Sequence, residues 1–179
     1  MTLGSQDLAR VIGEWHNGAH HFNQKPPSGF RHIGTGSYRT AYLHEDSNLV
    51  YKCGTYWCNI AESYMARRLI NRSQRELDVR VRIPRTTTYR IRNYANPSDY
   101  RDEVLCRVVV QEYAENTHDT HCTSWDYVSP CDCYGWNGGR CYRELWEYLG
   151  RWAGLSDMHH ENIRHNRDTN EFWIIDLAC

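Results

Sequence analysis

Lysine is nearly absent from this sequence of 179 residues. Of its 21 basic residues, only Lys25 and Lys52 are lysines, and the others are arginines. The sequence also lacks an apolar run long enough to cross a membrane, and its first residues contain no signal-peptide core. We therefore expect a soluble chain that stays in the cytosol, without a membrane partner. Its eight cysteines would be mostly reduced there, which favours burial or metal binding over a disulfide framework.

Neither sign of charge is in excess. The formal net charge is −1, whereas nucleic-acid-binding domains usually carry a strong basic surplus, so we expect no nucleic-acid partner. Hydrophobic residues make up 40% of the chain and aromatic residues 13%, which argues against disorder. The length is sufficient for one domain, or for two small lobes that share a cleft.

The apolar periodicity predicts an α+β fold. Strands dominate the first half and a helix, a polar loop and a short hairpin close the second. The expected elements are a short helix from Ser5, strands over 30–43 and 49–52, a helix over 59–70, strands over 79–94 (interrupted by Pro84) and 104–114, a helix over 142–155 and a strand over 172–178. This order divides the chain into an N-terminal helix and linker (1–29), a strand-rich lobe (30–114), a Cys/His-rich insert (115–141) and a C-terminal region (142–179).

The stretch "GTGSY" (34–38) lies between two predicted strands. Glycines allow a backbone to approach a phosphate closely, although a simple hairpin turn fits the same pattern. Lys52 ends the next apolar strand, where a compact ammonium could contact a phosphate or extend its end group to solvent. Glu62, in the helix whose Ile60, Tyr64 and Leu69 lie near one face, is either the counter-charge of Lys52 or a solvent-facing residue.

The loop "LSDMHHENI" (155–163) concentrates polar side chains before a short apolar strand. Asp157 and Asn162 are five residues apart, and Asp176 follows between two isoleucines and Leu-Ala. Amide and carboxylate oxygens are hard ligands that suit Mg²⁺ bound to substrate phosphates. The pattern therefore predicts that Asn162 and Asp176 bind the metal, which leaves Asp157 to orient or deprotonate an attacking hydroxyl.

In this order the motifs resemble the protein-kinase-like superfamily. "GTGSYRTAY" resembles its glycine-rich loop, and "LVYK" resembles its lysine-bearing strand. "VVQEYA" resembles the hinge strand that holds adenine, "DMHHEN" the catalytic loop, and "IIDLA" the D-F-G metal site. The resemblance covers about residues 30 to 179. It implies a strand-rich N-lobe, a much reduced C-lobe and a nucleotide cleft between them.

The resemblance also implies roles for individual residues and the cofactors ATP and Mg²⁺. The nucleotide would be bound by Gly34, Gly36, Ser37, Lys52, the gatekeeper Gln111 and backbone groups of Glu112 and Ala114. The catalytic residues would be Asp157, Lys52 and Glu62. Mg²⁺ would be bound by Asn162 and Asp176.

Several positions depart from the family pattern. Arg39 replaces the third glycine of the loop, which would reduce how closely the loop covers phosphates. Leu155-Ser156 replaces the usual His-Arg, so the arginine that reads a phosphorylated activation loop is missing. His159 replaces the catalytic-loop lysine, as in small-molecule kinases of the aminoglycoside phosphotransferase type, and Ala178 stands where glycine is expected.

The sequence ends three residues after Asp176, without the activation segment and large C-lobe helices of the family. Trp146, Trp152 and Trp173 would then be partly uncovered, which predicts a homodimer or a protein partner over this apolar surface. Short kinase-like chains of this kind resemble proteins carried by bacteriophages and mobile elements.

The insert carries its own candidate site. H-x-x-H-C and C-x-C motifs could supply a structural zinc ion, although their spacing matches no standard finger, and a loop with reduced thiols remains the alternative. The candidate ligands are His118, His121, Cys122, Cys131, Cys133 and Cys141.

Two functional hypotheses follow from the sequence. The first is a kinase-like phosphotransferase that uses ATP and Mg²⁺ and whose acceptor is a hydroxyl of a protein or a small molecule. The second is a pseudokinase-like module that binds nucleotide or regulates a partner without catalytic turnover.

Overall fold

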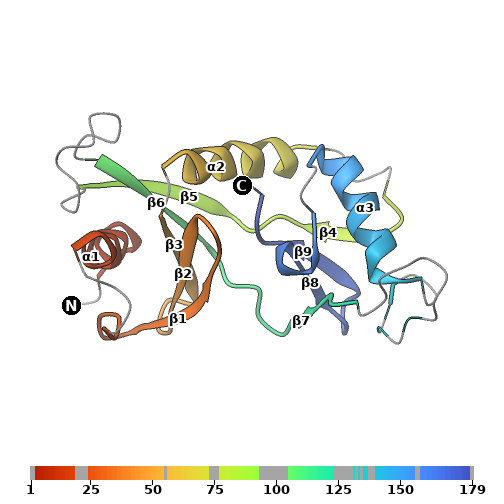
Figure 1. The fold of residues 1–179 in the computed structure, drawn as a ribbon, viewed down its shortest axis with the longest axis horizontal. Helices are drawn as coiled ribbons and strands as arrows, with labels where there is room; N and C mark the ends of the chain where they lie inside the picture. Colours follow the sequence, from red (N-terminus) through yellow and green to blue (C-terminus); the bar gives the residue numbers. More distant parts are fainter. Residues whose placement is uncertain are drawn as a thin grey trace. The chain divides into compact units, whose positions relative to one another are not determined.

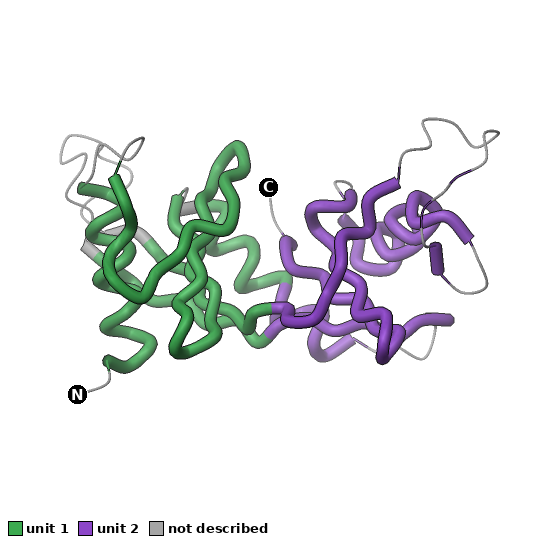
Figure 2. Tube along the Cα trace, turned by 90° about the horizontal axis from the view of Figure 1, so that it is seen from below, with its two compact units in different colours: residues 1–65, 85–113, 178–179 green, residues 66–84, 114–177 purple. Residues whose placement is uncertain are grey.

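The structure is a computed structural model with two compact units. It describes residues 3–18, 24–54, 56–72, 77–92, 105–122, 131, 133, 135–136, 140–155 and 158–177. The first unit contains residues 1–65, 85–113 and 178–179, and the second contains residues 66–84 and 114–177 (Figure 2). Within the described ranges, no helix has the length and apolar character needed to span a bilayer.

The first unit is built on a five-stranded antiparallel sheet (Figure 1). Its strand order is β1-β2-β3-β6-β5, in which neighbours are paired antiparallel. The hairpin β1–β2 and the strand β3 follow one another in sequence, and β6 then pairs with β3. The strands are β1 (Phe30–Thr35), β2 (Arg39–His44), β3 (Leu49–Gly54), β5 (Thr86–Arg92) and β6 (Leu105–Glu112).

Helix α1 (Ser5–Gly18) packs against β3, β5 and β6 and closes the apolar core of the first unit. Its Leu8 and Ile12 are buried with Tyr51 and Val108 of the sheet. Gly13 permits this close packing, because a Cβ there would lie 2.0 Å from Ile91 Cδ1. A side chain at this position would therefore force the helix away from the sheet.

Helix α2 (Tyr56–Ile70) follows β3 and begins three residues earlier than the sequence pattern predicts. Its predicted apolar face is wrong at Tyr64, which is exposed. The buried side of the helix instead carries Asn59, Glu62, Ala66 and Leu69. Because two of these four residues are polar, a search for apolar periodicity selects the wrong face.

The second unit contains a smaller four-stranded sheet and helix α3 (Tyr142–Ala153). The strand order is β4-β9-β8-β7, with β4 parallel to β9 and the other pairs antiparallel. The strands are β4 (Arg80–Arg82), β7 (His118–Asp119), β8 (Ile163–Asn166) and β9 (Glu171–Ile174), and a 3-10 turn, η2 (His160–Asn162), precedes β8. The predicted strand 79–94 is therefore two strands, which belong to different sheets on either side of Pro84. The α+β class is confirmed.

Two of the three tryptophans that the sequence analysis expects to be uncovered are buried. Trp152 on α3 and Trp173 on β9 are 6% and 8% exposed. Arg72 and Arg82 place their guanidinium groups over the two indole rings, 5.5 and 4.4 Å from the ring centroids. The second unit thus covers this apolar surface with its own arginines, so these two residues give no support to a partner at this surface.

His165 on β8 lies in the core of the second unit, 1% exposed. The hydroxyl of Tyr142 lies 2.7 Å from Nδ1, and Nε2 lies 3.1 Å from the side-chain oxygen of Asn170. The ring also stacks on Phe172. Because the Asn170 oxygen can only accept, Nε2 carries the proton and Nδ1 accepts from Tyr142, as suits a neutral imidazole.

Burial lowers the pKa of His165 below its usual 6.5, and the nearby charge of Arg167 acts in the same direction. Below pH 6.5, His165 binds a proton more readily in the unfolded chain than in the folded chain. Its contribution to the free energy of unfolding is therefore present above pH 6.5 and is lost as the pH falls toward the lowered pKa of the folded state. We expect the free energy of unfolding from urea titrations to be lower at about pH 5 than at about pH 7.5.

The variant His165→Gln is the matched control, since its amide can pair with Tyr142 and Asn170 but does not titrate in this range. Its stability should change less than that of the wild type between the two pH values. Equal changes in both proteins would show that His165 is not the group responsible.

Candidate nucleotide-binding site and candidate metal centre

A buried ionic cluster lies at the centre of the first unit. Lys52 Nζ on β3 donates to Glu62 Oε1 on α2 at 2.6 Å, and Arg39 Nη1 on β2 donates to Glu62 Oε2. The side chain of Lys52 is 8% exposed, that of Glu62 is 1% exposed and that of Arg39 is 7% exposed. A carboxylate this deeply buried is costly unless it is paired, and here each oxygen has its own cation.

The strand register brings these groups together. Arg39 begins β2 directly opposite Gly54, and Lys52 lies opposite Ala41. Gly54 has a φ of +141°, and a Cβ there would lie 2.3 Å from the carbonyl oxygen of Tyr38. The glycine therefore lets the start of β2 approach the end of β3 and places Arg39 within reach of Glu62.

The Lys52–Glu62 pair is one of the two alternatives open for Glu62 from the sequence, whereas the role of Arg39 was not predicted. Arg39 was noted only as a departure from a glycine pattern, but its side chain is buried and paired with Glu62. The arrangement depends on the register of two strands, which places the first residue of β2 beside the last residue of β3.

The stretch 34–38 forms the end of the β1–β2 hairpin, as the turn interpretation predicts. The amide of Gly36 donates to the carbonyl of Arg39 at 2.8 Å. A Cβ at Gly34 would meet nothing within 4 Å, and at Gly36 only the Arg39 carbonyl oxygen at 3.9 Å. Neither residue has a positive φ, so neither packing nor backbone conformation requires glycine at these two positions. Ser37 is exposed in the same turn.

The predicted hinge residues lie at the end of β6 and just beyond it. Gln111 is buried and paired in register with Val50 and Thr86. The amide of Glu112 donates to the Arg85 carbonyl at 3.3 Å. The carbonyl of Ala114 accepts from the Thr117 hydroxyl at 2.6 Å. One backbone group of each predicted adenine-binding residue is therefore already engaged.

In the second unit, Asn162 and Asp176 lie at the same end of the β8–β9 hairpin. Ile163 pairs with Ile174, and the amide of Ile175 donates to the Asn162 carbonyl at 2.9 Å. The two predicted metal ligands therefore flank one backbone hydrogen bond, and both are half-buried. His159 caps η2 by accepting from the amide of Glu161. Asp157, the predicted base, lies outside the described residues.

Four of the six predicted zinc ligands come together in the second unit. Each offers a sulfur, all four sulfurs lie within 4.8 Å of one another, and the cluster could hold a metal ion such as zinc. The residues are Cys122, Cys131, Cys133 and Cys141, all half-buried and free.

The two candidate histidines of the insert lie outside this cluster. His118 belongs to β7, where it pairs with His165. The ring of His121 packs against His160 at 5.1 Å between centroids. Elsewhere in the described chain, Cys53 is also a free thiol and Cys58 is disulfide-bonded.

The thiols of the cluster differ in acidity. A hydrogen bond from Cys122, together with the backbone amide of Cys133, lowers the pKa of Cys131 to about 6. Burial raises the pKa of Cys141 and of Cys133. A thiolate is the form that binds metal ions, so Cys131 offers a ligand in the required ionisation state near neutral pH.

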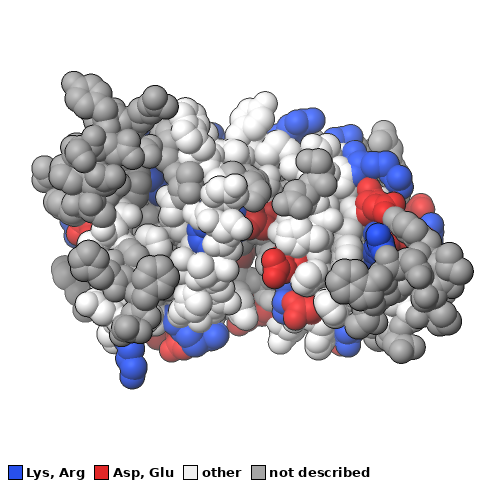
Figure 3. Space-filling view, in the orientation of Figure 1, with Lys and Arg blue, Asp and Glu red and all other residues white. Residues whose placement is uncertain are grey.

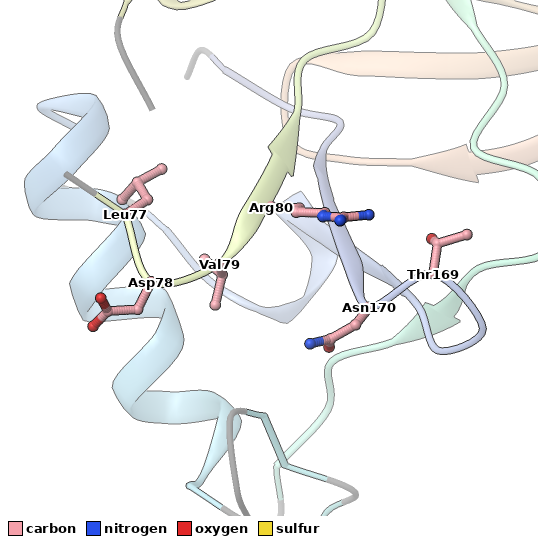
Figure 4. Close-up of a pocket in the computed structure, with 6 residues that line it drawn as sticks. All are labelled: Leu77, Asp78, Val79, Arg80, Thr169 and Asn170. Carbon is pink, nitrogen blue, oxygen red and sulfur yellow. The ribbon is translucent and has the colours of Figure 1, made fainter. Parts of the chain in front are cut away.

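A surface cavity of about 600 Å³ lies elsewhere in the second unit (Figure 4). It is lined by the segment before and within β4 and by the β8–β9 turn, and it contains none of the predicted site residues. The residues that line this cavity are Leu77, Asp78, Val79, Arg80, Thr169 and Asn170.

On the face drawn in Figure 3, basic and acidic side chains of the described residues are interspersed.

Comparison of the chain with protein-family models, with curated proteins and with solved structures found no match.

The buried carboxylate yields a direct test of the cluster. Glu62→Ala would leave Lys52 and Arg39 as buried cations without their shared partner, so we expect a loss of about 3–5 kcal/mol in the free energy of unfolding. Glu45 pairs with Arg31 at 3.5 Å, but both side chains are more than half exposed. Glu45→Ala should therefore cost less than about 1 kcal/mol. Similar losses in the two variants, measured by urea denaturation, would contradict the buried pairing.

Proposed function

We propose that this protein is a kinase-like phosphotransferase that uses ATP and Mg²⁺ and transfers the γ-phosphate to a hydroxyl of a protein or small molecule. The observation that carries the proposal is the buried Lys52–Glu62 pair, at 2.6 Å, between the third strand of a sheet and the helix that follows it. A lysine on the third strand, paired with a glutamate on a helix, positions nucleotide phosphates in protein kinases.

The cations of the cluster support an anionic ligand. Arg39 and Lys52 each donate to one oxygen of Glu62. A phosphate group beside Lys52 would accept hydrogen bonds from the ammonium group. Transfer of a phosphoryl group depends mainly on charge neutralisation and on positioning.

The turn at 34–38 supports the same ligand. Nothing in the fold requires glycine at Gly34 or Gly36, since a Cβ would meet no close neighbour at either position. Glycine there leaves space beside the backbone, so a ligand can approach it closely. By the family resemblance, backbone groups of Glu112 and Ala114 would hold adenine.

By the family resemblance, Asn162 and Asp176 would be the metal ligands and Asp157 the base. Asn162 and Asp176 flank one hydrogen-bonded position of the β8–β9 hairpin and offer two oxygen atoms for Mg²⁺. Asp157, five residues before Asn162, would orient or deprotonate the acceptor hydroxyl. These roles continue the resemblance to the protein-kinase-like superfamily.

The alternative is a module that binds a nucleotide without turnover. The buried Arg39 favours it, because the side chain occupies the second oxygen of Glu62 and stands where the family has a flexible glycine. A second fixed cation would hold a phosphate firmly, although catalysis needs stronger interactions in the transition state than in the bound ground state.

We expect the wild-type protein to release labelled phosphate from ATP, or transfer it to an acceptor, only in the presence of Mg²⁺. Asp176→Asn and Asp157→Ala should both reduce turnover by at least about a hundredfold, because a metal ligand and a general base each contribute that much or more. Asp168→Asn, in the exposed β8–β9 turn, is the matched control and should keep the wild-type rate.

Thermal unfolding separates the two functions. ATP with Mg²⁺ at a hundred times its dissociation constant should add about 2.7 kcal/mol of stability to the wild type, and Lys52→Met should abolish this gain. A shift that depends on Lys52, with turnover equal in wild type and Asp157→Ala, would support the binding module. The absence of any nucleotide-dependent shift would contradict both.

A further inference from the structure

We propose that Cys122, Cys131, Cys133 and Cys141 bind one zinc ion through four thiolates and that this ion joins the end of β7 to the start of α3. The site is independent of the proposed phosphotransferase function. All four ligand positions would come from the protein, which leaves no open position for a substrate. The ion would therefore be structural rather than catalytic.

The sulfur atoms lie close enough together to share a single centre. Zinc–sulfur bonds of about 2.3 Å in a tetrahedron separate the sulfurs by about 3.8 Å. Here Cys141 Sγ lies 3.0 Å from Cys122 Sγ, 3.6 Å from Cys131 Sγ and 3.9 Å from Cys133 Sγ. Cys122 and Cys131 are 3.0 Å apart. Because Cys141 is close to all three others, the sulfurs form one group and not two separate pairs.

One backbone amide already points at a sulfur, since the amide of Cys133 donates to Cys131 Sγ at 3.4 Å. Cys141 is the N-cap residue of α3, and the N-terminal end of a helix favours negative charge. A zinc ion with four thiolates carries a net charge of −2, so the Cys133 amide and the helix end would stabilise the loaded site.

Hydrogen bonds also connect the elements that the ion would join. Thr120, between β7 and Cys122, donates to the Ile163 carbonyl at 3.2 Å and accepts from Trp146 Nε1 on α3 at 3.1 Å. On the other side, Trp136 Nε1 donates to the Cys141 carbonyl at 2.9 Å. β7 itself is two residues long. A bridge from Cys122 to Cys141 would therefore fix a short strand to the helix beside it and limit the unfolded chain between them.

Metal content is the primary test. The wild type, purified without chelators from medium supplemented with zinc, should contain about one zinc ion per chain. Cys122→Ser and Cys141→Ser should reduce zinc to background. Cys53→Ser removes a free thiol of the first unit, and His118→Ala and His121→Ala remove the two rejected ligands, so all three controls should retain zinc. A wild type without zinc, or loss of zinc in a histidine variant, would overturn the ligand assignment.

Measurements on the wild type do not depend on whether the serine variants fold. Chelation should lower the melting temperature, and zinc should restore it, because the ion binds the folded chain preferentially. Replacement of zinc by cobalt should give the intense visible absorption of a tetrahedral tetrathiolate. Bound zinc should also protect four thiols from alkylation. A pair of disulfides among these cysteines in the purified protein, or a cobalt spectrum without thiolate character, would contradict the proposal. All of these measurements are made without nucleotide, so their outcome does not test the proposed phosphotransfer.

Discussion

The first unit depends on the burial of one carboxylate between two cations. Glu62 is 1% exposed, and the alternative to pairing it with Lys52 and Arg39 is an isolated charge in the core, which costs several kcal/mol. This requirement ties three elements to one another, since the partners come from β2, β3 and α2. The side-chain amide of Asn59 adds a second polar contact from α2 to the Arg107 carbonyl of β6, at 2.6 Å. Polar contacts therefore help to attach helix α2 to its sheet, whereas α1 packs on the sheet through apolar side chains.

This difference explains which parts of the fold could be predicted. Helix α1 and the strands of the first sheet follow from apolar periodicity and turns, because their burial is apolar. Helix α2 was predicted, but its buried face was not, since the pattern selected Tyr64 while Asn59 and Glu62 are the buried residues. The Lys52–Glu62 pair was one of two alternatives for Glu62, raised because a rare lysine at the end of an apolar strand needs a counter-charge. The second cation, Arg39, depends on strand register and on the space left by Gly54, which no local pattern reveals.

In the second unit, the sequence predicted the chemistry of the insert better than its geometry. Spacing alone offered six ligands, whereas the group of side chains that lies together contains the four cysteines and neither His118 nor His121. The exposure of Trp152 and Trp173 was predicted wrongly, since the arginines that cover them are distant in sequence. Asn162 and Asp176 were grouped correctly at one hairpin end, because a short hairpin brings the residues that flank it together. Their binding of Mg²⁺ stays a prediction.

Because lysine is scarce and Lys52 is buried, acylation of lysine can measure local opening of this protein. Lys25 is exposed, whereas the side chain of Lys52 is 8% exposed and donates to Glu62, so the chain has one accessible and one protected side-chain amine. Acylating reagents would modify Lys25 directly, but they would reach Lys52 only when β3 and α2 separate. The ratio of the two modified peptides in a mass spectrum would then measure how often this unit opens, with Lys25 as the internal standard.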